Sequence, residues 1–271
     1  MDNIYRKLAE VRSKNQSVAV CTVVHTKGST PRKIGAKMLV DTKGNITGTI
    51  GGGDLEKAVI ENALHQLTEG KHKLFRHDLV HHHGMCCGGT VDVFIEIIMK
   101  KNRLYVFGAG HTGQALVKYA HNFSFEIYLI DERKEYIRNC TIEEVNKLNL
   151  PHQQALQALP FDDSSYICIM THSHPVDREI LAYCLSKPHA YLGMIGSRRK
   201  VEMTKKKFIE AGIADHEKIA SVDMPMGIFI GAEGPDEIAL SIVAKLISVK
   251  NKSVANLSER HDPDEVNQIA L

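Results

Sequence analysis

Three histidines and two adjacent cysteines lie within seven positions in the segment HHHGMCC, residues 81–87. Imidazole nitrogens and thiolates are common ligands of zinc and other transition metals. Structural zinc sites, however, space their ligands as C-x2-C or H-x3-H, and the side chains of adjacent Cys86 and Cys87 diverge on an extended chain. The spacing therefore disfavours a zinc cluster. It leaves two interpretations of Cys87: a soft thiolate ligand for a transition metal, or a small buried residue at the start of a strand.

A second chemical motif is the GxGxxG turn at Gly108, Gly110 and Gly113, which follows an apolar strand and opens a helix. Gly108 permits the tight turn, Gly110 lets a pyrophosphate approach the backbone, and Gly113 lets the helix pack against the strand. This context predicts a nucleotide or dinucleotide site; the alternative is a domain of the same shape that has lost its ligand. Asp131 ends the next predicted strand, where a carboxylate could accept from a ribose hydroxyl, whereas Arg133 could favour a phosphate.

Further loops follow predicted strands of the same region, where such sheets bind their ligands. The loop THSH carries His172 and His174, which could bind metal, shuttle protons or merely line the loop, and Asp177 is expected to cap a helix. In GSRRK, Arg198 and Arg199 open a predicted helix whose N–H groups could hold an anion with them. The alternative is a solvated cationic face. The segment IFIGAEGPDE predicts a simple strand-to-helix turn.

The first hundred residues contain two glycine loops of their own. The loop GSTPR places Ser29 and Arg32 where they suit phosphate or carboxylate contacts, although a plain hairpin connection is equally consistent. The run from Gly51 to Gly53 is more specific, because three consecutive glycines cost backbone entropy and are expected where a ligand approaches closely. Acidic residues in the turn that follows, Glu56 among them, argue against a simple phosphate cradle.

The elements that must position these motifs fall into two groups. Up to residue 100 the pattern is mixed α and β, with a helix that ends near Gly70 after the glycine run. The other elements expected there are a helix over 4–11 and strands over 17–26, 37–42, 46–50 and 90–98. Beyond it, apolar strands alternate with helices, which predicts a Rossmann-like, doubly wound parallel sheet. We therefore expect an N-terminal mixed α+β domain at 1–100, a Rossmann-like domain at 101–252 and a polar tail at 253–271.

Composition narrows the classes of function. A net charge of +2 gives no support for general nucleic-acid binding, and no apolar run approaches the roughly 20 residues of a membrane helix. The N-terminus lacks the features of a secretion signal. The six cysteines are scattered through apolar stretches, which favours reduced thiols and a cytoplasmic protein over a disulfide framework. A homodimer is the ordinary expectation for such a chain.

Seven motifs occur in a fixed order along the chain: GSTPRKIGAKMLV, GTIGGGDLE, MCCGGTVDVFIE, VFGAGHTG, THSHPVDREIL, YLGMIGSRRK and IGAEGPDEIALSIVAK. As a series they closely resemble the XdhC/CoxI family, whose members are accessory proteins of xanthine dehydrogenase and related molybdenum hydroxylases. The resemblance covers nearly the whole chain and implies an N-terminal XdhC/CoxI domain followed by a Rossmann domain. With 271 residues and without the cysteine spacings of iron–sulfur clusters, the chain is too short to be a complete xanthine dehydrogenase.

The resemblance further implies a chaperone in purine catabolism that binds the molybdenum cofactor, of the molybdopterin type. Such a protein supports exchange of an oxo for a sulfido ligand and delivers the cofactor. The implied partners are an apo molybdenum hydroxylase of the xanthine dehydrogenase type and a cysteine desulfurase. Cys87 matches the family's CGG cysteine and is the implied contact to molybdenum. Many relatives carry GGC where this chain has GGG, so a thiolate at Gly53 is absent here.

Two other functions stay open on the sequence. One is an NAD(P)-dependent oxidoreductase with His111, His172 or His174 as the acid–base group, and the other is a metal-binding adaptor that engages a hydroxylase without touching its cofactor. For the chaperone hypothesis, loops of the two domains would meet across a cleft, with Cys87, His172 and His174 as the catalytic residues. The expected cofactor-binding residues are Gly28, Ser29, Arg32, Gly51, Gly52, Gly53, Glu56, Gly88, Gly89, Gly108, Gly110, His111, Gly113, Asp131, Arg133, Ser197, Arg198 and Arg199.

Overall fold

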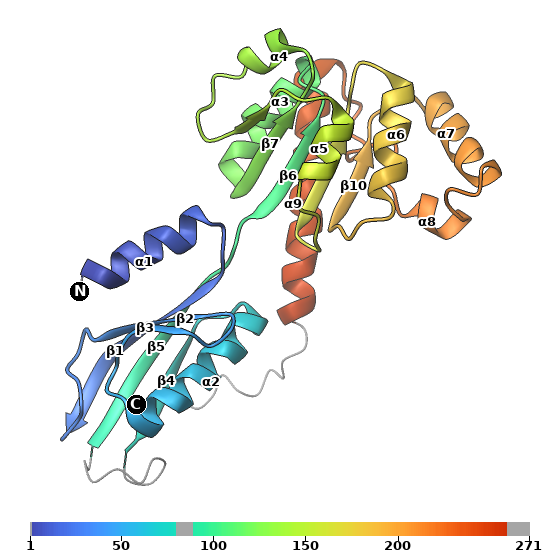
Figure 1. Cartoon of the computed structure of the whole chain (residues 1–271). Helices are drawn as coiled ribbons and strands as arrows, with labels where there is room; N and C mark the ends of the chain where they lie inside the picture. Colours follow the sequence, from blue (N-terminus) through green and yellow to red (C-terminus); the bar gives the residue numbers. More distant parts are fainter. Residues whose placement is uncertain (1, 80–88, 259–271) are drawn as a thin grey trace. The chain divides into compact units, whose positions relative to one another are not determined.

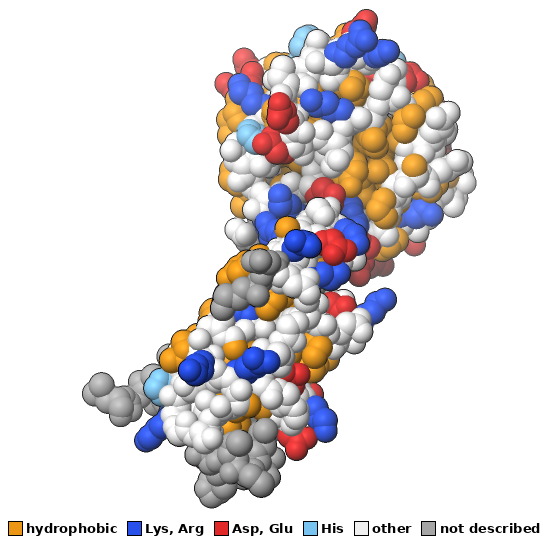
Figure 2. Space-filling model, turned by 60° about the vertical axis from the view of Figure 1, so that its left-hand side comes forward, with side chains coloured by type: hydrophobic (Ala, Val, Ile, Leu, Met, Phe, Trp, Pro, Cys, Tyr) orange, Lys and Arg blue, Asp and Glu red, His pale blue; other side chains and the backbone are white. Residues whose placement is uncertain are grey.

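The computed structural model describes residues 2–79 and 89–258 (Figure 1). The chain folds into two compact units, Met1–Lys100 and Lys101–Leu271. The segment HHHGMCCG, and with it Cys86, Cys87 and Gly88, lies outside the described residues, as do residues 259–271. Basic and acidic side chains are interspersed over the face drawn in Figure 2. No helix in the described ranges has both the length and the apolar character needed to cross a membrane.

The first unit is a five-stranded antiparallel sheet with two helices. Its strands lie in the order β3-β2-β1-β5-β4. The elements are α1 (Asp2–Ser13), β1 (Val18–Gly28), β2 (Lys37–Asp41), β3 (Ile46–Gly48), α2 (Gly53–Glu69), β4 (Lys73–Asp78) and β5 (Gly89–Ile98). Helix α2 buries Leu55, Val59 and Ala63 against one face of the sheet, as their three-and-four spacing predicts. It ends at Gly70, which adopts the left-handed conformation expected of a helix stop.

The second unit is a parallel five-stranded sheet in the order β10-β9-β6-β7-β8, which confirms the predicted α/β class. Its strands are β6 (Asn102–Phe107), β7 (Phe125–Ile130), β8 (Asn146–Leu148), β9 (Ser165–Ile169) and β10 (Tyr191–Met194). Its helices are α3 (His111–Ala120), a 3-10 turn (His121–Phe123), α4 (Lys134–Arg138), α5 (His152–Ala158), α6 (His174–Cys184), α7 (Arg198–Glu210), α8 (His216–Ala220) and α9 (Gly234–Ser258).

Helices cover both faces of this sheet (Figure 1). Successive residues of a strand point to opposite faces. Accordingly Leu104 and Val106 of β6 pack in the core that holds α3 and α9, whereas Tyr105 and Phe107 pack in the core that holds α5 and α6. The β6–α3 turn is therefore held at the carboxyl edge of a sheet that is buried on both sides.

Two expectations for the end of the chain need correction. The segment 228–230 is not a strand. Before it, Asp223 forms only an isolated bridge with Gly193 of β10. Phe229 is 91% exposed, so the apolar residues of this segment belong to an irregular connection and not to a buried strand. Helix α9 continues to Ser258, into the segment expected to be a polar tail, because neither glycine nor proline interrupts the sequence before Pro263.

Gly113→Ala is expected to destabilise the second unit by about 2 kcal/mol. A methyl group at position 113 would lie 1.9 Å from the carbonyl oxygen of Gly108, a backbone atom that moves only if the turn moves. This clash outweighs the roughly 1 kcal/mol by which alanine improves helix propensity. Urea unfolding followed by far-UV circular dichroism measures the difference. The matched control is Gly110→Ala, where an added methyl group meets nothing within 4 Å; equal losses in the two variants would contradict the argument.

Candidate functional site

The GxGxxG turn joins β6 to α3, and its three glycines differ in what surrounds them. Gly108 has a positive φ of 114°, and a side chain there would lie 2.2 Å from the carbonyl oxygen of Met170. A side chain at Gly113 would collide with the carbonyl oxygen of Gly108 in the same turn. Gly110, in contrast, has an ordinary extended conformation and no atom within 4 Å of an added methyl group. The protein's own packing therefore requires glycine at two of the three positions and leaves space beside the third.

That space lies at the start of a ten-residue helix. Gly110 is the N-cap of α3 and supplies no side chain to cap it, and His111 is the first helical residue. The first N–H groups of a helix have no partner within the helix and carry its positive dipole end. An anion that approaches Gly110 can therefore accept from these N–H groups without displacing a side chain.

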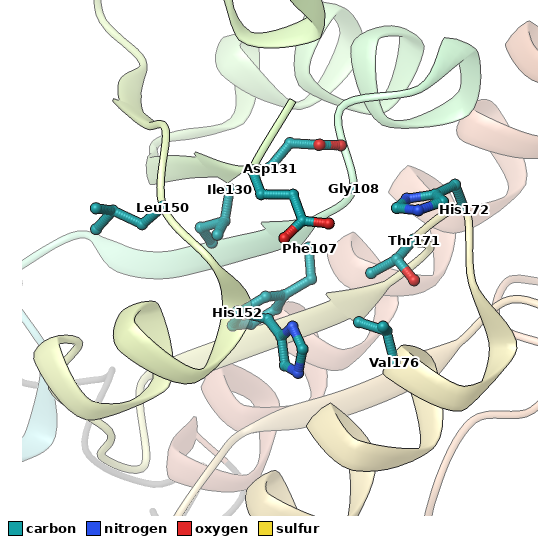
Figure 3. Close-up of a pocket in the computed structure, with 10 residues that line it drawn as sticks. Phe107, Gly108, Ile130, Asp131, Leu150, His152, Thr171, His172 and Val176 are labelled. Atoms are coloured by element: carbon teal, nitrogen blue, oxygen red, sulfur yellow. The ribbon is translucent and has the colours of Figure 1, made fainter. Parts of the chain in front are cut away.

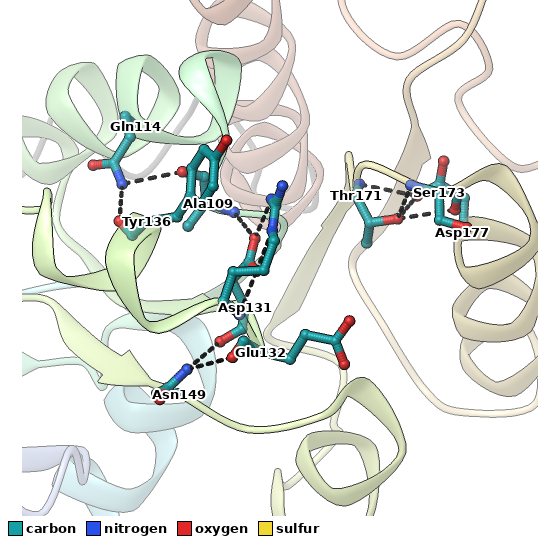
Figure 4. A network of polar contacts seen from close by, with 10 residues as sticks. Ala109, Gln114, Asp131, Glu132, Tyr136, Asn149, Thr171, Ser173 and Asp177 are labelled. Atoms are coloured by element: carbon teal, nitrogen blue, oxygen red, sulfur yellow. Dashed lines mark hydrogen bonds and ion pairs between the residues drawn. The ribbon is translucent and has the colours of Figure 1, made fainter.

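Asp131 directly follows β7 and clamps this turn from the next strand (Figure 4). Its Oδ2 accepts from the N–H of Ala109 at 2.8 Å and from Nη2 of Arg133 at 2.8 Å. Its Oδ1 accepts from the N–H and Nε of Arg133, both at 2.9 Å. Arg133 also stacks over the ring of Tyr136, 3.9 Å from its centroid. Thus the two residues expected to contact a ribose or a phosphate are each other's partners in the structure.

The pKa of Asp131 agrees with a structural role for its carboxylate. Burial, the largest influence, acts to raise the pKa of Asp131, but the hydrogen bonds from Arg133 and Ala109 outweigh it and hold the pKa below its ordinary value. The carboxyl group is thus charged at neutral pH. A charged, almost fully buried carboxylate positions the backbone of Ala109, one residue before the open Gly110.

A pocket that is open to solvent lies beside the turn (Figure 3). Its walls combine apolar side chains with a few polar groups, which is the usual composition of a small-molecule site. The lining residues are Phe107, Gly108, Ile130, Asp131, Glu132, Leu150, His152, Thr171, His172 and Val176. Of the predicted site residues, the structure thus brings Gly108, Asp131 and His172 together here.

Seven lining residues were not among the predicted ones: Phe107, Ile130, Glu132, Leu150, His152, Thr171 and Val176. Leu150 and His152 follow the short strand β8, whose sequence NKL is too brief to be recognised as a strand. Glu132 stands beside the expected Asp131, and that adjacency was the available signal. His152 is held by Glu179, with Nε2 2.9 Å from the carboxylate.

The loop after β9 carries the two histidines of THSH, and its polar groups are held by Asp177 (Figure 4). Asp177 does not cap the helix, which corrects the prediction. It lies inside the first turn of α6, and its Oδ1 accepts from the N–H of Thr171 at 2.9 Å and from Oγ1 of Thr171 at 2.6 Å. Its Oδ2 lies 3.3 Å from Nδ1 of His174 but accepts no hydrogen bond in the structure. Burial raises the pKa of Asp177, and the Thr171 and His174 contacts offset part of that rise.

The GSRRK motif follows β10, which β9 separates from β6. Ser197 is the N-cap of α7 but its hydroxyl makes no capping hydrogen bond, and Arg198 and Arg199 are exposed in the first turn. None of the three lines the pocket beside Gly108. Nor does His111, which lines a separate groove with Gln114 and Asp236.

In the first unit, three glycine motifs that are distant in sequence lie together. Gly28 pairs with Gly89 across β1 and β5, and a side chain at Gly89 would lie 2.5 Å from the carbonyl oxygen of Ser29. A side chain at Gly51 would lie 2.5 Å from Pro31. The loop that carries Ser29 and Arg32 therefore packs between the glycine run and the start of β5.

Glu56 has a structural contact rather than an open carboxylate. Its Oε1 accepts from the N–H of Gly52 at 2.8 Å, from the N–H of Ile50 at 3.2 Å and from Oγ1 of Thr49. This holds the glycine run at the start of α2. Gly52 and Gly53 both have positive φ, and nothing lies within 4 Å of an added methyl group at Gly52. Among the described residues, no group of three histidine, cysteine, aspartate or glutamate side chains could hold a metal ion.

Comparison with known proteins places both units in one family. The model of the XdhC and CoxI family matches residues 11–78, and the XdhC Rossmann domain matches residues 104–246. A crystal structure of a xanthine dehydrogenase from Bacillus halodurans has a similar fold, with a TM-score of 0.52 and 22% identity over 91% of this chain and 95% of that chain.

Three curated relatives are similar in sequence. Uncharacterized protein YqeB of Escherichia coli K12 is 36% identical over 94% of this chain and 48% of the relative. A probable xanthine dehydrogenase subunit of Bacillus subtilis 168 is 27% identical over 60% of this chain and 47% of the relative. The chain thus spans about half the length of these two. Molybdenum cofactor insertion chaperone PaoD of E. coli K12 is 23% identical over 91% of this chain and 88% of the relative. By the match of both units, the chain belongs to the XdhC and CoxI family.

Proposed function

We propose that this protein binds the molybdenum cofactor, of the molybdopterin type, and delivers it to the apo form of xanthine dehydrogenase or a related molybdenum hydroxylase. The relative named as a molybdenum cofactor insertion chaperone supports this, because the similarity covers 88% of its length. The relative named as a probable xanthine dehydrogenase subunit supports the choice of client enzyme. Sulfuration of the cofactor, with a cysteine desulfurase as a second partner, is part of the same proposal. So are a homodimeric state and a place in the cytoplasm.

The observation that carries cofactor binding is the open space at Gly110. The molybdenum cofactor presents a phosphate, and the bound metal supplies the oxo-transfer chemistry that the client enzyme needs. Gly110 has no steric reason to be glycine within the protein, whereas a phosphate that accepts from the first N–H groups of α3 needs that space. The residues present therefore fit a phosphate-bearing cargo.

The first unit offers groups of its own that suit such a cargo. Gly52 presents unobstructed backbone at the start of α2, and Ser29 and Arg32 belong to the loop packed against the glycine run. The hydroxyl of Ser29 and the guanidinium of Arg32 are donors that a phosphate or a pterin carbonyl would accept from. The family resemblance assigns the contact to molybdenum to Cys87.

Gly110→Ala is expected to lower retention of the molybdenum cofactor at least about tenfold, a loss of about 1.4 kcal/mol, because the methyl group occupies the space that the phosphate needs. The protein would be incubated with cofactor released from a molybdoenzyme, separated by gel filtration and assayed for molybdenum and for pterin fluorescence. Gln157→Ala, an exposed change on α5, serves as control and should retain the cofactor like the wild type. Full retention by folded Gly110→Ala would contradict a phosphate at this turn.

Cys87→Ala is expected to lower molybdenum retention by about tenfold or more, because a thiolate is a favoured ligand of this metal. The neighbouring thiol provides a matched control, so Cys86→Ala should behave like the wild type. If Cys87→Ala retains as much molybdenum as the wild type, the contact between the thiol and molybdenum is contradicted, but cofactor binding is not. Negligible retention by the wild type as well as both variants would sink the cofactor-binding role.

A further inference from the structure

The carboxylate of Asp131 has no capacity left for a ligand. An ionised carboxylate offers about four lone-pair sites on its two oxygens. In this protein four N–H donors fill them: the N–H of Ala109 and three donors of Arg133. The side chain is 4% exposed. In dinucleotide-binding sheets an acid at this strand end accepts from the ribose. Here a ribose hydroxyl at Asp131 would have to displace a charge-assisted hydrogen bond.

The next residue has the opposite properties. Glu132 is exposed and lines the pocket, and its carboxylate makes no hydrogen bond or ion pair within the described part of the chain. Its backbone is nevertheless fixed, because Nδ2 of Asn149 donates to the carbonyl of Glu132 at 2.9 Å and to that of Asp131 at 3.0 Å (Figure 4). A fixed backbone with an uncommitted carboxylate at the pocket is the arrangement that a ribose diol needs.

The rest of the pocket suits a flat heterocycle. Ile130, Leu150 and Val176 give it apolar walls, and His152 and His172 add polar groups around the opening (Figure 3). Gly108 is part of both the pocket and the GxGxxG turn, so the pocket is continuous with the place where a diphosphate would accept from α3. Base, ribose and diphosphate thus each have a surface of matching chemistry along one continuous path.

We infer that this pocket receives the nucleoside of a ribonucleoside diphosphate moiety, and that Glu132 rather than Asp131 accepts from its ribose hydroxyls. The inference rests on the proposed function and deepens it, because it assigns to this protein a preference for a nucleotide-extended, dinucleotide form of the cofactor over the mononucleotide form. Asp131 keeps a positioning role for the turn.

The test is calorimetric titration of the full chain with ADP, CDP and GDP, with pyrophosphate as the probe that lacks a nucleoside. We expect the preferred nucleoside diphosphate to bind at least tenfold more tightly than pyrophosphate. Glu132→Gln should weaken its binding about tenfold and leave pyrophosphate unchanged. Glu135→Gln, an exposed acid on neighbouring α4, is the matched control and should have no effect.

Deoxynucleotides locate the contact. The wild-type protein should bind the 2′-deoxy or the 3′-deoxy form of the preferred ligand about tenfold more weakly than the parent ligand. Glu132→Gln should bind both deoxy forms with the same affinity as the parent ligand. Equal deoxy losses in both proteins, or pyrophosphate binding as tight as every nucleoside diphosphate, would overturn the inference.

A filled pocket separates this inference from the proposed function. Val176→Trp, checked for folding by circular dichroism, should lose nucleoside diphosphate binding but keep the mononucleotide cofactor, whose phosphate needs only the turn. If wild-type protein retains the mononucleotide cofactor and binds no nucleoside diphosphate more tightly than pyrophosphate, the inference fails alone. If it retains neither form of the cofactor, the proposed function fails with it.

Discussion

The contact on which the second unit's site depends is the hydrogen bond from the N–H of Ala109 to the carboxylate of Asp131. It joins the turn after β6 to the end of β7, and Arg133 locks the same carboxylate from the other side. The charge is buried, and its cost is offset by the four donors that surround it. Because the turn is held from outside, Gly110 and the start of α3 can stay open without becoming loose. The site is rigid at its edge and accessible at its centre.

The same device occurs at three glycine- or hydroxyl-rich loops. Glu56 holds the glycine run before α2, Asp131 holds the GxGxxG turn, and Asp177 holds the loop after β9 through Thr171. In each case a carboxylate accepts from a backbone N–H and orders the loop. These acids therefore fix the conformation of the loops, and the backbone and neighbouring residues remain available to contact a ligand. The carboxylates that sequence motifs single out are not the ones available to a ligand.

Much of the fold could be predicted from the sequence, because apolar strands such as SYICIM alternate with helices and because glycines stand where turns must form. The strand β4 escaped prediction since its exposed face carries Leu74 and Arg76 and its alternation is mixed with charge. The site was predicted only in part. The glycines were identified correctly as turn residues, but the partner of Asp131 lies 22 positions away and is set by how β6 and β7 pair. No local pattern encodes that neighbour, and none encodes the pocket behind it.

Helix α9 has a consequence for how the protein is made. It supplies Ala239, Ile242, Val243 and Leu246 to the core on one face of the parallel sheet, and it comes last along the described chain. Domains fold as units during synthesis, from the N-terminus onward. The first unit has all its strands by Ile98 and can fold early, whereas one apolar face of β6, β7 and β9 is covered only in part, by α3, until residue 246 has left the ribosome. For more than a hundred residues of synthesis, the incomplete second unit therefore presents apolar surface that can aggregate. Ribosome-associated chaperones would bind this surface.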